Sequence, residues 1–247
     1  MCCSNTHTHG ALGANAGIGL QFHSSVYVAA RFADPVHAYY GPTMSYAITE
    51  FSDVNGHRGP GLMLENVAAL PLSTASSLPG FGSALARPME SLPFLARAVV
   101  VLRDRTRGRL ELDGDRRTQI TYPFERGDLD RARTGMIALA RAYLASGAEQ
   151  VFLPVNDLAP VTTEGELDAL ESRALSTRDT SLIYAVHLFG GAVMGSDPTT
   201  SCCDEAGRVR GVKGLWVSDA SALPSNTGVN PQVTIMANAL RVAAGIV

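Results

Sequence analysis

The sequence predicts an α+β fold in which helices cover a large antiparallel sheet, and three observations support it. Segments of strand character follow one another from residue 24 to residue 122, two helical patterns come after them, and an apolar helical pattern ends the chain. Successive strands with no long helix between them favour antiparallel pairing. At 247 residues, 46% of them apolar, the chain is long enough for a full hydrophobic core in one large domain or two small ones.

The strands are predicted from alternation of apolar and polar residues. In residues 24–32, Val26, Val28, Ala30 and Phe32 fall on one face, as expected of a half-buried strand. The dipeptide Asp113-Gly114 is typical of a hairpin turn between its two flanking strands. The predicted strands are residues 24–32, 44–51, 62–68, 98–103, 109–112, 119–122 and 150–154.

The helices are predicted from apolar residues spaced three and four apart and from their end residues. Residues 83–95 form a weak pattern that two prolines interrupt, whereas residues 128–146 form a strong one that Gly147 ends. Thr163 and Glu166 form a capping box for a helix that reaches about Leu175. We expect the last helix, after Pro231, to bury Val233, Met236, Leu240, Ala243 and Ile246 or Val247.

Composition excludes several functions. The net charge is −3, so there is no basic footprint for nucleic acid, and the arginines of residues 103–117 alternate with acidic residues as in a solvated hairpin. No apolar run reaches the roughly 18–20 residues of a membrane span, and the N-terminus lacks the pattern of a signal peptide. The four cysteines form two adjacent pairs, which indicates a reducing compartment, so we expect a cytoplasmic protein.

The first twenty residues are irregular and carry no recognisable site. Their glycines have neither the spacing nor the preceding strand of a dinucleotide-binding loop, and the chain contains no Walker-type sequence. Cys2, Cys3, His7 and His9 fit no standard zinc spacing, so no metal site is predicted.

The chemically informative part is residues 187–247. His187 ends an apolar, strand-like run, and Asn230 follows 43 residues later, directly before Pro231. A histidine in this position is compatible with a hydrogen-bonded core residue or with a base that takes a substrate proton. Asn230 and Pro231 are compatible with ordinary helix capping, or with a helix N-terminus that binds an anionic group. The residues alone leave both pairs of alternatives open.

Two further features lie between and beside these residues. Residues 214–224 are predicted as a buried strand followed by an acidic turn at Asp219 and a proline stop. Gly190-Gly191 and Gly228 permit a close approach of the backbone to another group.

Three ordered motifs in this region resemble the C-terminal segment of the glucose–methanol–choline (GMC) flavoprotein oxidoreductases. They are a histidine followed by two glycines in residues 187–194, a GLxVxDxSxxP run in residues 214–224, and the sequence GVNP in residues 228–231. The HxxGG form followed by GVNP is most similar to the branch of cholesterol oxidases and long-chain alcohol oxidases. Residues 20–186 resemble the family's substrate domain more loosely.

The resemblance implies an FAD-dependent oxidation of a long-chain or sterol-like alcohol. His187 would take the hydroxyl proton, a hydride would pass to flavin N5, and Asn230 would hold the substrate oxygen. The cofactor would lie against the turn at Asp219 and the start of the last helix, which would point its positive end at the flavin ring. The FAD-binding residues implied in this way are Asp219, Ala220, Gly228, Asn230, Pro231 and Gln232.

The resemblance also implies that part of the enzyme is missing, because the chain has no glycine-rich Rossmann unit for the ADP part of FAD. We expect residues 1–186 to form a substrate-binding domain with an irregular start (1–20). Residues 187–247 are expected to be the active-site and FAD-binding segment, with the strand and helix of an FAD-binding domain. The N-terminal FAD-binding portion would be separate or absent, so the isolated chain should bind FAD weakly or not at all.

Two other functions compete with this hypothesis. One is an inactive binding or assembly module that keeps the fold, although such a module would not need His187 and Asn230. The other is a serine hydrolase that uses Ser221, His187 and Asp219, but the chain contains no GxSxG elbow.

Overall fold

The computed structural model describes residues 15–54, 56–180 and 183–246, and it is an α+β fold built on a large antiparallel sheet, as predicted. The hydrogen-bonded strand order is β2-β3-β4-β1-β5-β6, and β7 and β8 also pair with β1. The strands are β1 (Ile18–Arg31), β2 (Ala47–Ile48), β3 (Leu62–Asn66), β4 (Leu95–Leu102), β5 (Gly108–Leu112), β6 (Thr118–Thr121), β7 (Gln150–Phe152) and β8 (Tyr184–Phe189). The α-helices are α2 (Pro71–Ser77), α3 (Ser83–Glu90), α4 (Arg126–Ala145), α5 (Asp168–Ser172) and α6 (Gln232–Ala244), with short 3-10 turns η1 (Leu92–Phe94), η2 (Glu164–Leu167) and η3 (Ala220–Ala222).

Two compact units interleave along the chain. The tail unit comprises the described residues up to His23, Arg103–Glu125 and the chain from Ala185 onward. The sheet unit comprises Ser24–Leu102 and Arg126–Tyr184. The division of function predicted between residues 186 and 187 stays a prediction.

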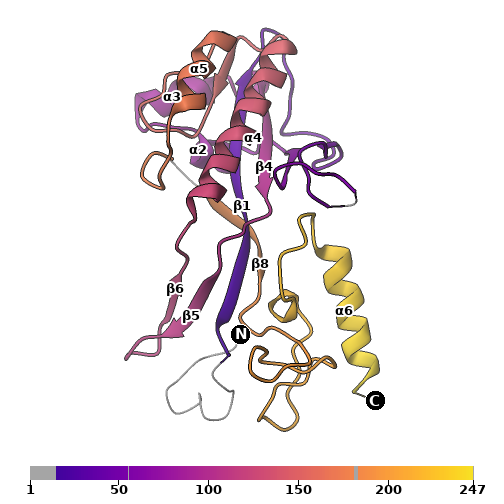
Figure 1. Cartoon of the computed structure of the whole chain (residues 1–247). Coiled ribbons are helices and arrows are strands. Elements are labelled where there is room, and N and C mark those ends of the chain that lie inside the picture. Colours follow the sequence, from indigo (N-terminus) through magenta and orange to yellow (C-terminus); the bar gives the residue numbers. More distant parts are fainter. Residues whose placement is uncertain (1–14, 55, 181–182, 247) are drawn as a thin grey trace. The chain divides into compact units, whose positions relative to one another are not determined.

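In the sheet unit, α4 runs along one face of the paired strands β1 and β4 (Figure 1). Val26 lies opposite Val100, and Val28 lies opposite Ala98, so the even-numbered residues of both strands point to the same face. All four are buried in the main hydrophobic cluster. The alternation predicted for residues 24–32 is therefore confirmed.

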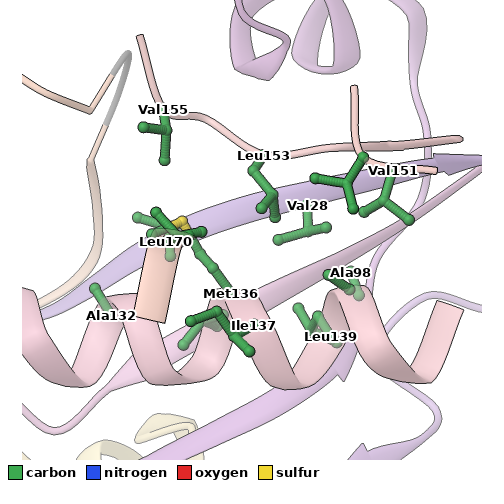
Figure 2. Close-up of a cluster of buried hydrophobic side chains, with 14 of the residues drawn as sticks. Val28, Ala98, Ala132, Met136, Ile137, Leu139, Val151, Leu153, Val155 and Leu170 are labelled. Carbon is green, nitrogen blue, oxygen red and sulfur yellow. The ribbon is translucent and has the colours of Figure 1, made fainter. Parts of the chain in front are cut away.

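The apolar stripe of α4 fills this core. Met136, Ile137 and Leu139 lie in the same buried cluster as Leu153, and Met136 extends from the helix toward Leu170 (Figure 2). Gly135 sets how closely the helix approaches, because a Cβ atom there would lie 2.4 Å from Cγ1 of Val100. The predicted helix is thus confirmed, and its apolar face is the buried one.

The helix ends of the sheet unit also follow the sequence. Gly147, two residues after the end of α4, has a φ of +91°, and the N–H of Ala148 donates to the carbonyl of Tyr143 at 3.0 Å, as in a glycine C-cap. Glu166 accepts a hydrogen bond from the backbone N–H of Thr163 at 3.2 Å in the predicted capping box. The helix that follows ends at Ser172, a little before the predicted Leu175.

Residues 92–95 belong to the core rather than to a pocket. Leu95 is fully buried in a cluster with Ala29, Leu78 and Phe152, and Leu92 packs against that cluster. This segment is therefore structural. The sequence pattern missed α2, and it predicted a longer second strand than the two residues of β2.

In the tail unit, β5 and β6 form the predicted hairpin, but the turn is longer than a two-residue turn. The carboxylate of Asp113 accepts hydrogen bonds from the N–H groups of Asp115 and Arg117 at 3.0 and 2.8 Å. These bonds and that from the Gln119 side chain lower the pKa of Asp113. Arg116, with a φ of +61°, adopts the left-handed conformation.

Two expectations about the tail are wrong. Residues 214–217 form no strand: Leu215 is 41% exposed, and Trp216 makes only an isolated bridge to Arg208. The stripe of α6 is exposed rather than buried, because the helix packs on its own unit through the opposite face, which carries Asn238 and Val242. The exposed fractions are 75% for Val233, 51% for Met236, 74% for Leu240 and 52% for Ile246, and Ala243 is exposed as well.

Val247, Cys2, Cys3, His7 and His9 lie outside the described residues. Among the residues that are described, no group of three or more histidine, cysteine or acidic side chains could hold a metal ion. None of the helices in the described ranges is long and apolar enough to cross a membrane.

Candidate active site

His187 lies near the end of β8, in the tail unit, and its ring is half-buried. Phe189, two residues on, is fully buried and fixes the end of the strand. Burial lowers the pKa of His187 below its ordinary value of 6.5, because desolvation disfavours the charged ring. The ring is therefore neutral at neutral pH and able to exchange a proton with a bound group.

A second histidine, His23 on β1, contacts His187 directly. The Nδ1 atoms of the two rings are 3.0 Å apart, and the rings are nearly perpendicular, with an interplanar angle of 88°. His23 has no solvent-exposed surface, and burial lowers its pKa to about 3, with further lowering by His187 and by the positive charge of Arg103. His23 is thus a neutral, buried ring that contacts the half-buried ring of His187.

The other face of His23 meets the loop that leads to Asn230. The backbone N–H of Gly228 donates to Nε2 of His23 at 3.1 Å. Gly228 has a φ of +69°, a conformation that favours glycine, and it is buried. His23 therefore connects the strand of His187 with the loop that precedes Asn230.

A buried asparagine anchors the same loop. Asn226 is 2% exposed, and its Nδ2 donates to the carbonyls of Phe22 at 3.0 Å and of Asp104 at 2.8 Å. Its backbone N–H donates to the side-chain oxygen of Gln21 at 3.2 Å. These bonds fix the loop to the first half of β1 on the side of His23.

The predicted cofactor residues near η3 form a tight turn. The carboxylate of Asp219 accepts from the N–H of Ser221 at 2.8 Å and from its hydroxyl group, while the carbonyl of Ala220 accepts from the N–H of Gly190 at 3.3 Å. Asp219 is exposed. The serine and the aspartate of the alternative hydrolase are thus partners of each other, whereas the ring of His187 is joined to His23.

The helix start differs by one residue from the prediction. Pro231, which is buried, occupies the N-cap position of α6, and Gln232 begins the helix. The cap makes no side-chain hydrogen bond to the first turn. Asn230 and Gln232 are exposed beside this end.

Gly190 and Gly191, which follow β8, make close contacts with the backbone of β1. Gly190 has a φ of +75°, and a Cβ atom there would lie 2.0 Å from the carbonyl oxygen of Gly19. Gly191 donates its N–H to the carbonyl of Ile18 at 3.1 Å. The close approach predicted for Gly190-Gly191 is therefore one between β1 and the segment after β8.

The donor set of this unit fits a flavin in part. Pro231, the N-cap of α6, makes no side-chain hydrogen bond to the first turn, and the amide side chains of Asn230 and Gln232 are exposed at this end of the helix. Such donors match the carbonyl oxygens and the developing negative charge of a flavin ring. The N–H of Gly228, by contrast, is already bound to His23.

His23, Asn226 and Gln21 were not predicted from the sequence. No local pattern marks them, because the strand prediction began only at residue 24 and their contacts are with residues more than 80 positions away. A prediction of β1 from residue 18 would have placed His23 on a strand, but not against His187.

Comparison with known proteins identifies the family. The sequence model described as "GMC oxidoreductase" matches residues 104–239, more than half of the chain. The chain belongs to this oxidoreductase family, and the resemblance seen in the sequence motifs is confirmed.

Two curated relatives illustrate the relationship. An uncharacterised GMC-type oxidoreductase of Mycobacterium tuberculosis is 34% identical over 92% of this chain and 35% of its own length. A long-chain-alcohol oxidase of Arabidopsis thaliana is 28% identical over 61% of this chain and 21% of its own length. The chain thus spans about a third of the length of the former relative.

Among solved structures, the fold is similar to that of formate oxidase from Aspergillus oryzae, determined in a study of FAD modification. The TM-score is 0.59 at 15% identity, over 94% of this chain and 47% of that one. This likeness supports the α+β fold, with the matched region covering about half of the solved chain.

Proposed function

We propose that this chain is the active-site part of an FAD-dependent enzyme that oxidises an alcohol, with His187 and Asn230 at the reacting carbon–oxygen bond. The observation that carries the proposal is the neutral, half-buried ring of His187, held at the end of β8 by the buried ring of His23. A neutral imidazole in a fixed position is suited to exchanging the proton of a hydroxyl group.

Each residue has a defined task in this proposal. His187 takes the proton of the substrate hydroxyl, a contribution of about 10²–10⁴ in rate for a well-placed base. Asn230, exposed at the start of α6, holds the substrate oxygen with its amide. The bonds of Asn226 and Gly228 keep the loop before Asn230 in place, which supports a constant geometry between the two residues.

FAD, when bound, would supply the acceptor for the hydride of the alcohol carbon. The residues proposed to hold it are Asp219, Ala220, Gly228, Asn230, Pro231 and Gln232, as the family resemblance implies. The N-terminus of α6 supports this assignment, because the N–H groups of a helix's first turn favour negative charge on a neighbouring ring.

The proposed substrate is a long-chain or sterol-like alcohol. The similarity to a long-chain-alcohol oxidase over 61% of the chain supports this proposal.

The proposed partner is an N-terminal FAD-binding portion, on the same or another polypeptide. Two observations support it: the chain spans 35% of its relative's length, and α6 exposes a stripe of Val233, Met236 and Leu240. Residues three and seven positions apart share one helix face, so this stripe is a continuous apolar surface. We propose that the FAD-binding portion covers it.

The proposal can be tested by co-expressing this chain with the N-terminal part of the Mycobacterium tuberculosis relative. We expect the isolated chain to purify colourless, and the complex to carry flavin and to oxidise long-chain alcohols. His187→Ala should then lower kcat by at least about 10²-fold while the flavin content stays unchanged.

A matched control is His37→Ala, which removes an exposed histidine of the sheet unit. If the His187→Ala complex turned over alcohol as fast as the complex without a substitution, the proposed role of His187 as the base would be contradicted. A complex that binds flavin but oxidises no alcohol would favour the inactive binding module, and stoichiometric flavin in the isolated chain would refute the need for a partner.

A further inference from the structure

The hydrogen bonds of His23 determine where its proton lies. Its Nε2 accepts the backbone N–H of Gly228 at 3.1 Å, so Nε2 carries a lone pair. Because burial lowers the pKa of His23 to about 3, the ring is neutral at ordinary pH and has one proton. That proton is therefore on Nδ1, the atom 3.0 Å from Nδ1 of His187.

The same reasoning then fixes His187. Since His23 donates from Nδ1, the Nδ1 of His187 must accept, and the single proton of a neutral His187 lies on Nε2. We infer that His23 is a positioning residue that holds His187 in the tautomer protonated on Nε2. The hydrogen-bond chain runs from the Gly228 N–H through His23 to His187.

This inference rests on the proposed function and specifies how His187 meets its ligand. In the resting site, His187 offers Nε2–H as a donor to an oxygen atom of the bound molecule. In this tautomer Nε2 has no lone pair, so His187 would take the hydroxyl proton only from its other tautomer, protonated on Nδ1. The hydrogen bond from His23 therefore disfavours the form in which His187 is a base.

Neighbouring groups also keep the two histidine rings neutral. Arg103, which follows β4, disfavours a positive charge on His23, and His187 does so as well. A doubly protonated His187 would direct its Nδ1–H at the Nδ1–H of His23, so the pair also opposes protonation of His187. The low pKa of His187, which burial causes, is then expected to rise when the donor on His23 is removed.

The tautomer is measurable in the 247-residue chain without flavin or substrate, by long-range ¹H–¹⁵N correlation of the imidazole rings. His187→Gln identifies the resonances of His187 among the six histidines. We expect Nδ1 of His187 to be pyridine-like and its Nε2 to be pyrrole-like, with the opposite assignment for His23. Protonated Nδ1 on His187 in the unchanged chain would overturn the inference.

Variants of His23 provide a second, independent measurement. In His23→Leu, we expect His187 to populate both tautomers and its titration midpoint to move up toward the ordinary value of about 6.5. His23→Asn, which keeps an amide donor, should retain more of the Nε2–H form. The control His37→Leu removes a histidine that bonds to Tyr39 in the other unit and should leave His187 unchanged.

An unchanged tautomer ratio and midpoint of His187 in a folded His23→Leu chain would also overturn the inference. These outcomes do not depend on alcohol oxidation, so they distinguish a wrong role for His23 from a wrong proposed function.

Discussion

At the scale of single residues, Gly190 shows how the backbone requirements of the site can be separated from side-chain chemistry. It has a φ of +75°, and any Cβ atom would lie 2.0 Å from the carbonyl oxygen of Gly19. Gly214 has a similar φ of +78°, but nothing lies within 4 Å of a Cβ atom there. The two glycines thus have a similar φ, but only Gly190 has a backbone atom where a Cβ atom would lie.

Gly190→Ala should therefore destabilise the protein clearly more than Gly214→Ala. The second substitution costs only the left-handed conformation, about 1–2 kcal/mol, whereas the first adds a clash between backbone atoms. Unfolding in urea measures both free energies. Equal losses in the two variants would show that β1 can move away from Gly190 without cost.

The proposed catalytic residues illustrate what a sequence can reveal at this scale. His187 and Asn230 were predicted because each stands in a short motif, although their roles remain proposals. His23 was not predicted because it contacts His187 across 164 positions, and no local pattern encodes such a contact. Asn226 was missed for the same reason, since its partners lie on β1 and after β4.

At the scale of elements, helix α4 was predicted well because its apolar stripe, its glycine end and its buried face agree. Met136 has no exposed surface and lies at the centre of that face (Figure 2). The last helix has a comparable stripe, but 51% of Met236 is exposed. A stripe in the sequence shows which face is apolar, and it does not show what covers that face.

Truncating each methionine tests the contrast. Met136→Ala should lower the free energy of unfolding by about 2–5 kcal/mol, because it leaves a cavity in the core. Met236→Ala should change it by less than about 0.5 kcal/mol, as is usual for exposed positions. A large loss in Met236→Ala would mean that α6 is buried within the isolated chain.

The exposed stripe of α6 also bears on assembly. Leu240→Glu should weaken association with the co-expressed FAD-binding portion at least tenfold, because it places a charge in an apolar contact. Leu72→Glu is the matched control, since Leu72 is 85% exposed on α2 of the sheet unit and Leu240 is 74% exposed. Titration of labelled chain against its partner measures both, and equal affinities would exclude the stripe as the contact.

At the scale of the whole molecule, His23 and His187 make stability depend on pH. The pKa of His23 is about 3 in the folded chain and about 6.5 when unfolded, and that of His187 is lowered too. The unfolded chain therefore binds more protons below pH 6.5, so stability is lost as the pH falls from that value toward 3.

We expect the free energy of unfolding to fall by about 1.4 kcal/mol per pH unit for each fully coupled proton below about pH 6. Urea unfolding between pH 7 and pH 5 isolates this effect. Asp179, whose pKa of about 2 is lowered mainly by the Ser176 side chain, contributes only at lower pH. A constant free energy from pH 6.5 to pH 5 would contradict a buried, neutral His23.

The way in which α6 is attached to the tail unit affects how fast its backbone amides exchange with solvent. The helix is joined to the rest of the tail unit through the inward face of Asn238 and Val242, and through Arg241, which bonds to the carbonyl of Glu205 and to the sulfur of Met194. Amide hydrogens of α6 should therefore exchange with deuterated solvent much sooner than those of α4. When a partner covers the stripe, the same amides should become protected, so isotope exchange along thirteen residues reports assembly directly.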